Sequence, residues 1–578
     1  MRLIIVFDED FKFYDTDIII SDSKPIGIKE SQFIKVEVDG FKDYATKLDV
    51  YREDYAKSTK ASILKDVVTS SINNFYRNCT MPVFAWVETM HRTLGSNTFS
   101  EIVIVGFSKN IGYMPYYEAE GEINKRLLYK SYDAVPAILS SILNKKRINH
   151  TLVNKKNVYN LRARIYIRRY VLLMFKLVLF LGKSIKSNIT TTVHVDQSKY
   201  SSMMFSRGIA HTEFIEKLIK TYNNKILVHV ADGLVSKNKN ANYVRSVGIT
   251  NSLFYEQQIK VTTVLKAFFT IVKCILSLPK THNIKIEGVT FNFASAQREM
   301  LISYFDALIY KNTIKNYITP NIKMLVTCEM YTPFAYVISQ IAKEKGIKSA
   351  QLQSTAMSLR KEPSYFYADF FLMNTKKSAE TFKQIFPNHA KKIEFIGNIT
   401  VDENTNQEFN KNTNVKKVVY FSQPIISELK EEDLLLRKLV LLEKELGFKL
   451  FIKLHPRENR NKFESIENLK YIEDGLTFGQ YINNTDLAIF RTTSLGQQLL
   501  INNVPTITCL LTENSRQFNV DYIDRNYFGT VQDIDDIENR IENYSFLLKD
   551  FARFRKEYLK ANNLDKGLFY FHNKLNQL

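Results

Sequence analysis

The chain has 578 residues, of which 45% are apolar, 24% charged and 13% aromatic, as in an ordinary globular protein and unlike a disordered one. Eighty Lys and Arg against 60 Asp and Glu leave a net charge of +20. Nineteen Gly and twelve Pro exclude a collagen-like or low-complexity architecture, and the length suggests about three to five domain-sized pieces.

The cysteines and the N-terminal residues indicate a cytoplasmic protein. The four cysteines, Cys79, Cys274, Cys328 and Cys509, are far apart and form no CxxC pair, which predicts reduced thiols and no thiolate zinc site. The opening MRLIIVFDED lacks the long apolar core of a secretory signal. No run of 18 or more apolar residues is present, so we expect any contact with a membrane to be peripheral.

Short β-rich runs alternate with helical patterns along the chain. The predicted strands are LIIVF (3–7), EIVIVGF (101–107), TTVHV (191–195), KILVHV (225–230), KMLVTC (323–328), SAQLQ (349–353), IEFIGN (393–398), KKVVYFSQ (416–423), KLFIKLHP (449–456), LAIF (487–490) and TITCLL (506–511). Most are continuous apolar runs, as expected of parallel strands that are covered on both faces. Helical patterns over 335–347 and 434–448 include the C-capping glycines Gly346 and Gly447. This alternation predicts an α/β protein with doubly wound sheets.

The polar, Asn-rich segment 402–417 is interpreted as a linker between two Rossmann-like domains. The expected organisation is an N-terminal α/β region (1–133) that is either part of the first lobe or separate, a basic amphipathic helical segment (134–187), a first Rossmann-like domain that binds the acceptor (188–401), the linker (402–417), a second Rossmann-like domain that binds the donor (418–545), and C-terminal helices (546–578).

The basic segment has the composition of a membrane-surface helix. No acidic residue lies between Asp133 and Asp196, and YVLLMFKLVLFLG (170–182) is an apolar run that is too short to span a bilayer. Such a helix can lie in the interface of an anionic bilayer, and the predicted docking residues are Arg162, Arg164, Arg168, Arg169 and Lys176. A buried core helix with a solvated basic approach is the alternative. Nucleic acid is not an expected partner, because no zinc-finger, RNP-type or helix-turn-helix signature is present.

Ligands of doubly wound sheets bind at the carboxyl ends of the strands, so the turns that follow the strands are the candidate sites. In KILVHVADG, Asp232 directly follows a strand and Gly233 allows a sharp turn. A carboxylate placed there could take a proton from an attacking hydroxyl. The alternative is a simple Asp–Gly turn.

Two later turns suit a phosphate group. In KLFIKLHPRE, Pro456 ends a strand and leaves His455 between Lys453 and Arg457, which is a suitable setting for a phosphate oxygen. After LAIF, three hydroxyl residues, Thr492, Thr493 and Ser494, open a helix, and hydroxyls with free N–H groups at a helix N-terminus can hold an anion. A His at a strand end and an ordinary N-cap are the structural alternatives.

Together, these turns resemble the motifs of bacterial sialyltransferases and polysialyltransferases. The matching residues are Ala231-Asp232-Gly233 for the acidic-acidic-Gly motif, His455-Pro456 for the HP motif and Thr493-Ser494 for the paired Ser/Thr motif. VVYFSQPIISE (418–428) is similar to the opening of the second domain in polysialyltransferases, which adds Gln423 to the donor-binding residues. Residues 323–402 look more loosely like surface-polysaccharide and teichoic-acid-type transferases. Ala231 and the stretch Gln353-Ser354-Thr355 depart from these patterns, and Asp232 is left as the matching base.

The resemblance implies a GT-B glycosyltransferase fold, in which two Rossmann-like domains face each other across a cleft. It implies an inverting enzyme that moves sialic acid, or a related nonulosonic acid, from a CMP-activated donor to a glycan or glycolipid acceptor in bacterial capsule, lipopolysaccharide or another surface polysaccharide. Asp232 would be the base, and His455, Thr493 and Ser494 would stabilise the departing phosphate, helped by Lys453 or Arg457. We expect no cofactor and no metal, and interpret neither Asp8-Glu9-Asp10 nor Asp533-Ile534-Asp535 as a metal site.

Two alternatives remain at this point. Within the same fold, the donor could be a UDP-sugar or a CDP-polyol. From a different class, the chain could be a basic membrane- or nucleic-acid-binding protein without catalysis. Under the leading hypothesis, the protein is cytoplasmic and peripheral on the inner face of the cell membrane, with an anionic membrane surface as its partner.

Overall fold

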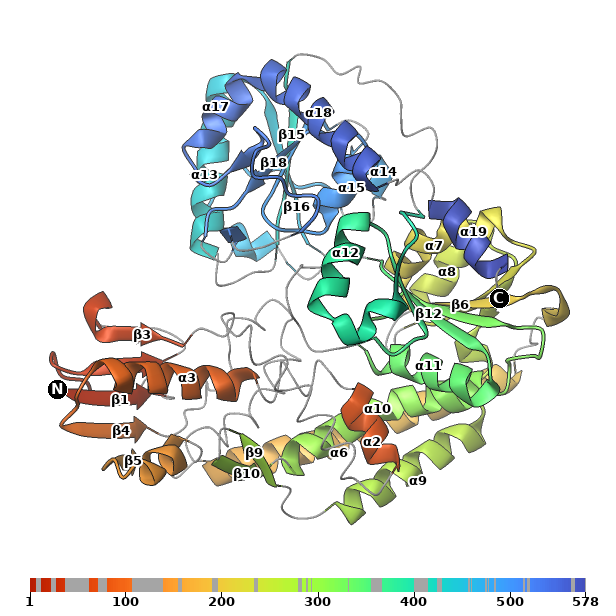
Figure 1. Ribbon diagram of the computed structural model, residues 1–578, viewed down its shortest axis with the longest axis horizontal. Coiled ribbons are helices and arrows are strands. Elements are labelled where there is room, and N and C mark those ends of the chain that lie inside the picture. Colours follow the sequence, from red (N-terminus) through yellow and green to blue (C-terminus); the bar gives the residue numbers. More distant parts are fainter. Residues whose placement is uncertain are drawn as a thin grey trace. The chain divides into compact units, whose positions relative to one another are not determined.

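Within the part of the chain that the structure describes, helices surround three parallel β-sheets, and a fourth sheet is a two-stranded antiparallel hairpin (Figure 1). The structure is a computed structural model, and it describes residues 1–6, 12–21, 28–36, 62–70, 81–105, 139–153, 158–189, 196–232, 238–278, 283–286, 289–292, 294–330, 332–354, 366–399, 414–423, 429–455, 458, 460–473, 476, 478–482, 485–512, 515–516, 520–562 and 567–576. None of the helices within these residues combines the length and the apolarity needed to cross a membrane.

The N-terminal sheet has the strand order β3-β2-β1-β4-β5, with every pair parallel. Its strands are β1 (Arg2–Val6), β2 (Ile18–Ser21), β3 (Phe33–Lys35), β4 (Glu101–Val105) and β5 (Thr151–Val153), and the helices α2 (Ser62–Ser70) and α3 (Met81–Ser96) lie between β3 and β4 in the chain. The apolar runs of β1 and β4 supply buried core residues such as Ile4 and Val103. Residues 1–153 therefore contain a doubly wound sheet of their own, a feature that the sequence left open.

The central sheet has seven strands in the order β14-β13-β12-β11-β6-β7-β8. They are β6 (Ser202–Ser206), β7 (Ile226–Val230), β8 (Ser252–Phe254), β11 (Met324–Thr327), β12 (Lys348–Leu352), β13 (Phe370–Met373) and β14 (Ile393–Phe395). The helices of this region are α6 (Val158–Ile189), α7 (Ile209–Thr221), α8 (Lys239–Ser246), α9 (Val261–Ser277), α10 (Ala294–Ile314), α11 (Pro333–Lys345) and α12 (Lys376–Ile385), and an antiparallel hairpin joins β9 (Asn283–Ile286) to β10 (Val289–Asn292). The first strand predicted here, 191–195, lies outside the described residues.

The C-terminal sheet is parallel and has the order β16-β15-β17-β18-β19. Its strands are β15 (Lys417–Phe421), β16 (Lys449–Lys453), β17 (Leu487–Phe490), β18 (Thr506–Cys509) and β19 (Thr530–Val531). The helices are α13 (Leu429–Leu446), α14 (Phe478–Ile482), α15 (Leu495–Ile501), α17 (Asp536–Glu542), α18 (Tyr544–Asn562) and α19 (Gly567–Asn576). Successive residues of the central strand β15 belong to two different cores: Val418 and Tyr420 pack with residues of α13, and Val419 and Phe421 pack with residues of α15 and α18. Burial on both faces explains the continuous apolar runs.

The central sheet and the C-terminal sheet each have a point where the strand order reverses. In the C-terminal sheet, β15 is followed by β16 on one side, and the chain then crosses to β17 on the other side. In the central sheet, β6 is followed by β7 and β8, and β11 then pairs on the opposite side of β6. The loops that leave neighbouring strands in opposite directions open a crevice at the carboxyl ends, which is where ligands of such sheets bind.

The prediction of an α/β protein with two Rossmann-like domains is confirmed, because the central and C-terminal sheets are both doubly wound. The expected bounds of these domains stay a prediction. Gly346 and Gly447 follow α11 and α13 with φ of 69° and 72°, as expected of C-capping glycines. Two details differ: β5 belongs to the segment expected to be helical (134–187), and β15 begins at Lys417, inside the expected linker, most of which lies outside the described residues.

The residue contacts divide the chain into two compact units. One comprises Met1–Gly208, Leu227–Ile347 and Glu362–Tyr367, and the other comprises Ile209–Ile226, Lys348–Lys361 and Ala368–Leu578. The expectation that two domains face each other across a cleft stays a prediction.

Candidate functional site

The carboxyl edge of the C-terminal sheet brings three polar segments together. Ser422 and Gln423 follow β15, His455 follows β16, and Arg491 to Ser494 follow β17. Because β15 pairs with both β16 and β17, the ends of these three strands are neighbours at the reversal point of the sheet. The site therefore lies where the strand order predicts a ligand crevice.

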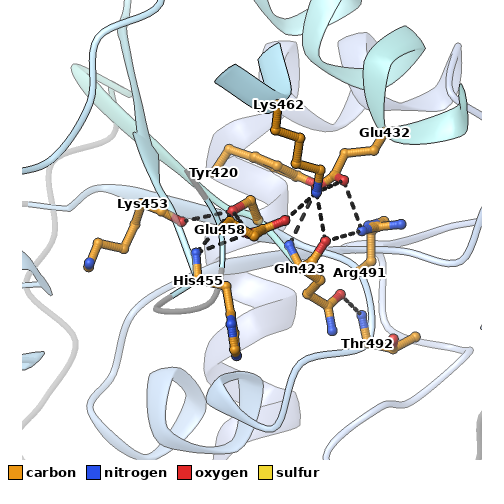
Figure 2. Close-up of polar contacts among 10 residues, drawn as sticks. Tyr420, Gln423, Glu432, Lys453, His455, Glu458, Lys462, Arg491 and Thr492 are labelled. Carbon is orange, nitrogen blue, oxygen red and sulfur yellow. Dashed lines mark hydrogen bonds and ion pairs between the residues drawn. The ribbon is translucent and has the colours of Figure 1, made fainter. Parts of the chain in front are cut away.

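A buried carboxylate holds these segments in place. Glu432, in the first turn of α13, is 0% exposed and forms ion pairs with Lys462 (2.5 Å) and Arg491 (3.1 Å). It also accepts a hydrogen bond from the Tyr420 hydroxyl (2.8 Å) (Figure 2). Arg491 is itself only 1% exposed. A buried cation, Arg491, and a partly buried one, Lys462, thus share one buried carboxylate, an arrangement that needs each partner to offset the desolvation of the others.

Gln423 is tied into this network. Its backbone carbonyl accepts hydrogen bonds from Lys462 Nζ (2.8 Å) and from Arg491 Nη2 (3.2 Å), and its side-chain Oε1 accepts one from the N–H of Thr492 (2.9 Å). The residue was expected to contact the donor. In the structure it is buried and links the loop after β15 to the loop after β17, so its amide sets the position of Thr492.

His455 is held through its backbone. Its N–H donates to Ser422 Oγ (3.2 Å) and to Glu458 Oε2 (3.1 Å), and Glu458 also pairs with Lys462. The side chains of His455 and Lys453 point away from the Glu432 network (Figure 2). Lys453 Nζ lies 5.8 Å from the ring centre of Tyr481. The other two residues of this turn that the sequence indicated, Pro456 and Arg457, lie outside the described residues.

The three hydroxyl residues after β17 have different surroundings. Thr493 Oγ1 accepts a hydrogen bond from the N–H of Leu495 (3.3 Å), and the Thr493 carbonyl accepts one from the Tyr522 hydroxyl (2.7 Å). Ser494 is exposed, and its side chain makes no capping hydrogen bond to α15. Thr493 therefore acts as the local cap, and the Ser494 hydroxyl is left at the surface.

The acid expected to be catalytic, Asp232, supports a helix. Its two carboxylate oxygens accept hydrogen bonds from the N–H groups of Asn240 (2.8 Å) and Ala241 (3.0 Å), in the first turn of α8. This is the capping interaction that the first turn of a helix requires. The backbone N–H of Asp232 in turn donates to Glu256 Oε1 (2.9 Å). Gly233, the expected turn residue, lies outside the described residues.

Asp232 and Glu256 share a small pocket near the carboxyl ends of β6, β7 and β11. The residues that line it are Phe180, Lys183, Arg207, Ala231, Asp232, Tyr255, Glu256, Asp306, Tyr310 and Phe334. Arg207 directly follows β6 and pairs with Glu329 after β11 (3.2 Å), so the pocket lies at the reversal point of the central sheet.

Glu256 is a carboxylate of this pocket that the sequence analysis did not indicate. Burial raises the pKa of its carboxyl, and the nearest cation is Lys183 Nζ at 3.8 Å. Glu256 lies in the short 3-10 helix Tyr255–Gln257, which contacts α6. No sequence motif surrounds Glu256. Its position in the pocket depends on contacts with Asp232 and with Lys183 of α6, which are distant in the sequence.

Behind the pocket lies a cluster of buried rings. His229 of β7 packs against Phe205, Tyr255 and Tyr310, with ring centres 5.3 to 6.0 Å apart. Complete burial lowers the pKa of His229 to about 4, so the imidazole is neutral near pH 7.

The described residues contain no group of three or more His, Cys, Asp or Glu that could hold a metal ion. Asp8, Glu9 and Asp10 lie outside them. Asp533 accepts a hydrogen bond from the N–H of Asp535 (3.2 Å) just before α17, so these residues stand at the start of a helix.

Comparison with known proteins gives similarities of structure alone. No family model matches the chain, and no curated protein matches its sequence. The UDP-GlcNAc 2-epimerase of Neisseria meningitidis bound to UDP-GlcNAc is 12% identical, with a TM-score of 0.41 over 66% of this chain and 100% of that chain. The wall teichoic acid polymerase TagF with CDPG is 13% identical, with a TM-score of 0.39 over 71% and 96% of the two chains.

A third structure, of the accessory secretory proteins 1, 2 and 3 of Streptococcus pneumoniae, is 9% identical, with a TM-score of 0.40 over 65% of this chain and 98% of that chain. None of these three is a sialyltransferase. Because every score is below 0.5, the argument for function rests on the residues described above.

Replacing Glu432 with Gln is expected to destabilise the C-terminal sheet region by about 3–5 kcal/mol, because Arg491 and Lys462 would lose the buried charge that compensates them. Urea denaturation, monitored by far-UV circular dichroism, measures the change in stability. Glu431→Gln, one position earlier on α13 and only half-buried, is the matched control and should change stability by less than about 0.5 kcal/mol. Equal stabilities for the two variants would contradict the role given to Glu432.

The buried His229 should make the protein less stable in acid. Since its pKa is about 4 in the folded chain and 6.5 when unfolded, the unfolded state binds more protons between these values, and stability falls as the pH drops from 6.5 through 4. The full effect is about 3 kcal/mol. His229→Phe should flatten the dependence of the melting temperature on pH over this interval, whereas His389→Phe, at a partly exposed position, should not. If the melting temperatures of the wild type and His229→Phe change with pH in the same way, His229 is not the cause of the loss of stability in acid.

Proposed function

We propose that the protein is a transferase that binds a nucleotide-linked donor at the carboxyl edge of β15, β16 and β17 and moves the linked group to an acceptor hydroxyl. One observation carries the proposal. At the reversal point of a doubly wound sheet, a buried charge network holds the loop ends rigidly, and Lys453 and His455 direct their side chains away from that network. Cationic and hydrogen-bonding groups that are held in place before the reaction suit the phosphate of a departing nucleotide.

For the donor, we propose a nucleotide-linked group, with a UDP-sugar, a CDP-polyol and a CMP-linked sugar as the candidates. The sequence motifs resemble those of enzymes that use CMP-sialic acid, and two of the three similar structures were solved with UDP-GlcNAc or CDPG. These ligands select the compounds to test first, and the motif resemblance keeps CMP-sialic acid in the same panel. We propose protein groups alone, without a metal, as the ligands of the phosphate.

For the acid–base group, we propose Glu256. Both carboxylate oxygens of Asp232 accept hydrogen bonds from the backbone of α8, so a proton placed on Asp232 would weaken the start of that helix. Glu256 lies in the same pocket, and burial raises the pKa of its carboxyl toward the pH at which a general base works best. Under this assignment, Asp232 is a positioning residue, which holds Glu256 through its N–H group.

The setting of the reaction is a proposal as well. We propose a glycan or glycolipid acceptor in the synthesis of a bacterial surface polysaccharide, which is consistent with a nucleotide-linked donor. We also propose a peripheral position on the inner face of the cell membrane, where such a donor is supplied. That Asp232 and His455 act on a single small molecule stays a prediction.

Donor binding can be tested at β16. His455→Ala should slow the release of nucleotide from the active donor by about 10²–10³-fold, because one stabilising donor to the phosphate is lost. Lys453→Ala should weaken binding of the same nucleotide in a thermal-shift assay with UDP, CDP and CMP. Lys449→Ala, at the exposed opposite end of the strand, is the control. If His455→Ala releases nucleotide and Lys453→Ala binds it as the Lys449→Ala control does, the donor site lies elsewhere.

Glu256 and Asp232 can be separated by their isosteric amides. Glu256→Gln should lower kcat by about 10²–10⁴-fold with little change in melting temperature, since a base is lost and its shape is kept. The wild-type rate should fall as the pH drops through the raised pKa of Glu256, because the base must be ionised. Asp232→Asn should lower the melting temperature, because an amide oxygen accepts fewer hydrogen bonds at the start of α8. An active Glu256→Gln beside an inactive but fully stable Asp232→Asn would return the role of base to Asp232.

A further inference from the structure

Two adjacent helices expose large apolar side chains. The helices α6 and α9 pack against each other and against α10 (Figure 1). Their outward apolar residues are exposed by 42% to 80%; they are Tyr170, Val171, Leu172, Met174, Phe175, Val178 and Ile185 on α6, and Phe269 and Leu276 on α9. We call these nine residues the α6/α9 face. Large apolar side chains that are exposed on two helices packed against each other indicate a site of interaction.

The spacing of these residues shows that they form stripes. Positions 171, 174, 178 and 185 recur at three, four and seven residues, and positions 269 and 276 are seven apart, so each set lies along one side of its helix. The opposite side of α6 carries Leu173, Leu177 and Phe180, which are buried. The helix is therefore apolar on its buried side and also on much of its outward side, which the packing of a core alone does not require.

The charges on these helices have one sign. Within their bounds, α6 and α9 contain nine Lys and Arg and no Asp or Glu. On α9, the exposed Lys266 and Lys273 alternate with Phe269 and Leu276. Lys176 and Lys183 of α6 turn inward instead, where they pair with Asp306 (3.0 Å) and Glu256 (3.8 Å). Lys176, which the sequence indicated as a docking residue, thus anchors α6 to α10, and the side chains of Arg162, Arg164, Arg168 and Arg169 lie outside the described residues.

We propose that the α6/α9 face lies in the interfacial region of an anionic lipid bilayer, with its apolar side chains among the acyl chains and the lysines of α9 at the lipid phosphates. An apolar stripe next to lysines, on helices without acidic residues, complements an anionic membrane surface. A nucleic acid would leave the apolar stripe in water. The sequence indicated α6 alone, whereas α9 adds two further exposed lysines to the exposed Lys186 of α6. The proposal is independent of the donor site.

The test is flotation of the full-length protein with phosphatidylcholine vesicles, with or without 30 mol% phosphatidylglycerol (about a third of the lipid, enough to give a strong negative surface potential). We expect flotation with the anionic vesicles and not with the neutral ones. The triple variant Phe175→Gln, Val178→Gln and Phe269→Gln should bind at least about tenfold more weakly. Lys266→Gln and Lys273→Gln should each weaken binding about fivefold.

The double variant Leu434→Gln and Leu441→Gln is the matched control, because it removes two apolar side chains of α13 that are 51% and 54% exposed. It should float like the wild type. Equal recovery of the wild type with neutral and anionic vesicles would overturn the proposal. So would flotation of the triple variant at the level of the wild type. A wild type that does not float, but forms a dimer that the triple variant abolishes, would show instead that a second copy of the chain covers this face. Nucleotide release measured in solution without lipid should be unchanged in the triple variant, whatever the outcome at the donor site.

Discussion

The carboxylate of Glu432 is the group on which the C-terminal lobe depends. It is fully buried, and burial of a carboxylate costs free energy unless cations and hydrogen-bond donors surround it. Those partners come from separate parts of the chain: Tyr420 from β15, Lys462 from the segment after β16, and Arg491 from the end of β17. The ends of three strands are thereby held in one arrangement, and the groups at the edge of the sheet keep their positions without help from a ligand.

The other lobe uses its acids in a similar way. Both carboxylate oxygens of Asp232 accept hydrogen bonds from the first turn of α8, and Glu256 accepts a hydrogen bond from the backbone N–H of Asp232. A carboxylate that follows a strand is thus part of the framework, and the carboxylate beside it faces the pocket. The chemical role of an acid is decided by what its oxygens contact, and a motif that marks the position of a carboxylate does not state which of two neighbouring acids remains available.

The long helix α6 contributes both to the pocket that contains Glu256 and to the α6/α9 face. One of its sides packs into the core and supplies Phe180 and Lys183 to the pocket, and the other exposes apolar residues beside those of α9. A ligand at the outer face and a ligand in the pocket would therefore contact the same rigid element. The ion pair of Lys176 with Asp306 fixes the rotation of this helix against α10, which determines the residues that it presents outward.

By itself, the sequence determined the parallel sheets, because strands buried on both faces must be continuous apolar runs, as in β1, β4, β15 and β17. It also placed the turns after β7, β16 and β17 correctly at the ends of strands. It did not reveal β3, β6 and β8, which are only three residues long or have polar ends, and it missed β2 and β13, although these are apolar like β17. Only the tertiary structure decided that Glu432 meets Arg491 and that Glu256 meets Asp232, pairs separated by 59 and 24 residues. Hydrophobic periodicity shows which side of a helix or strand is buried, but not which other element packs against that side. The contacts within a site depend on which elements pack together.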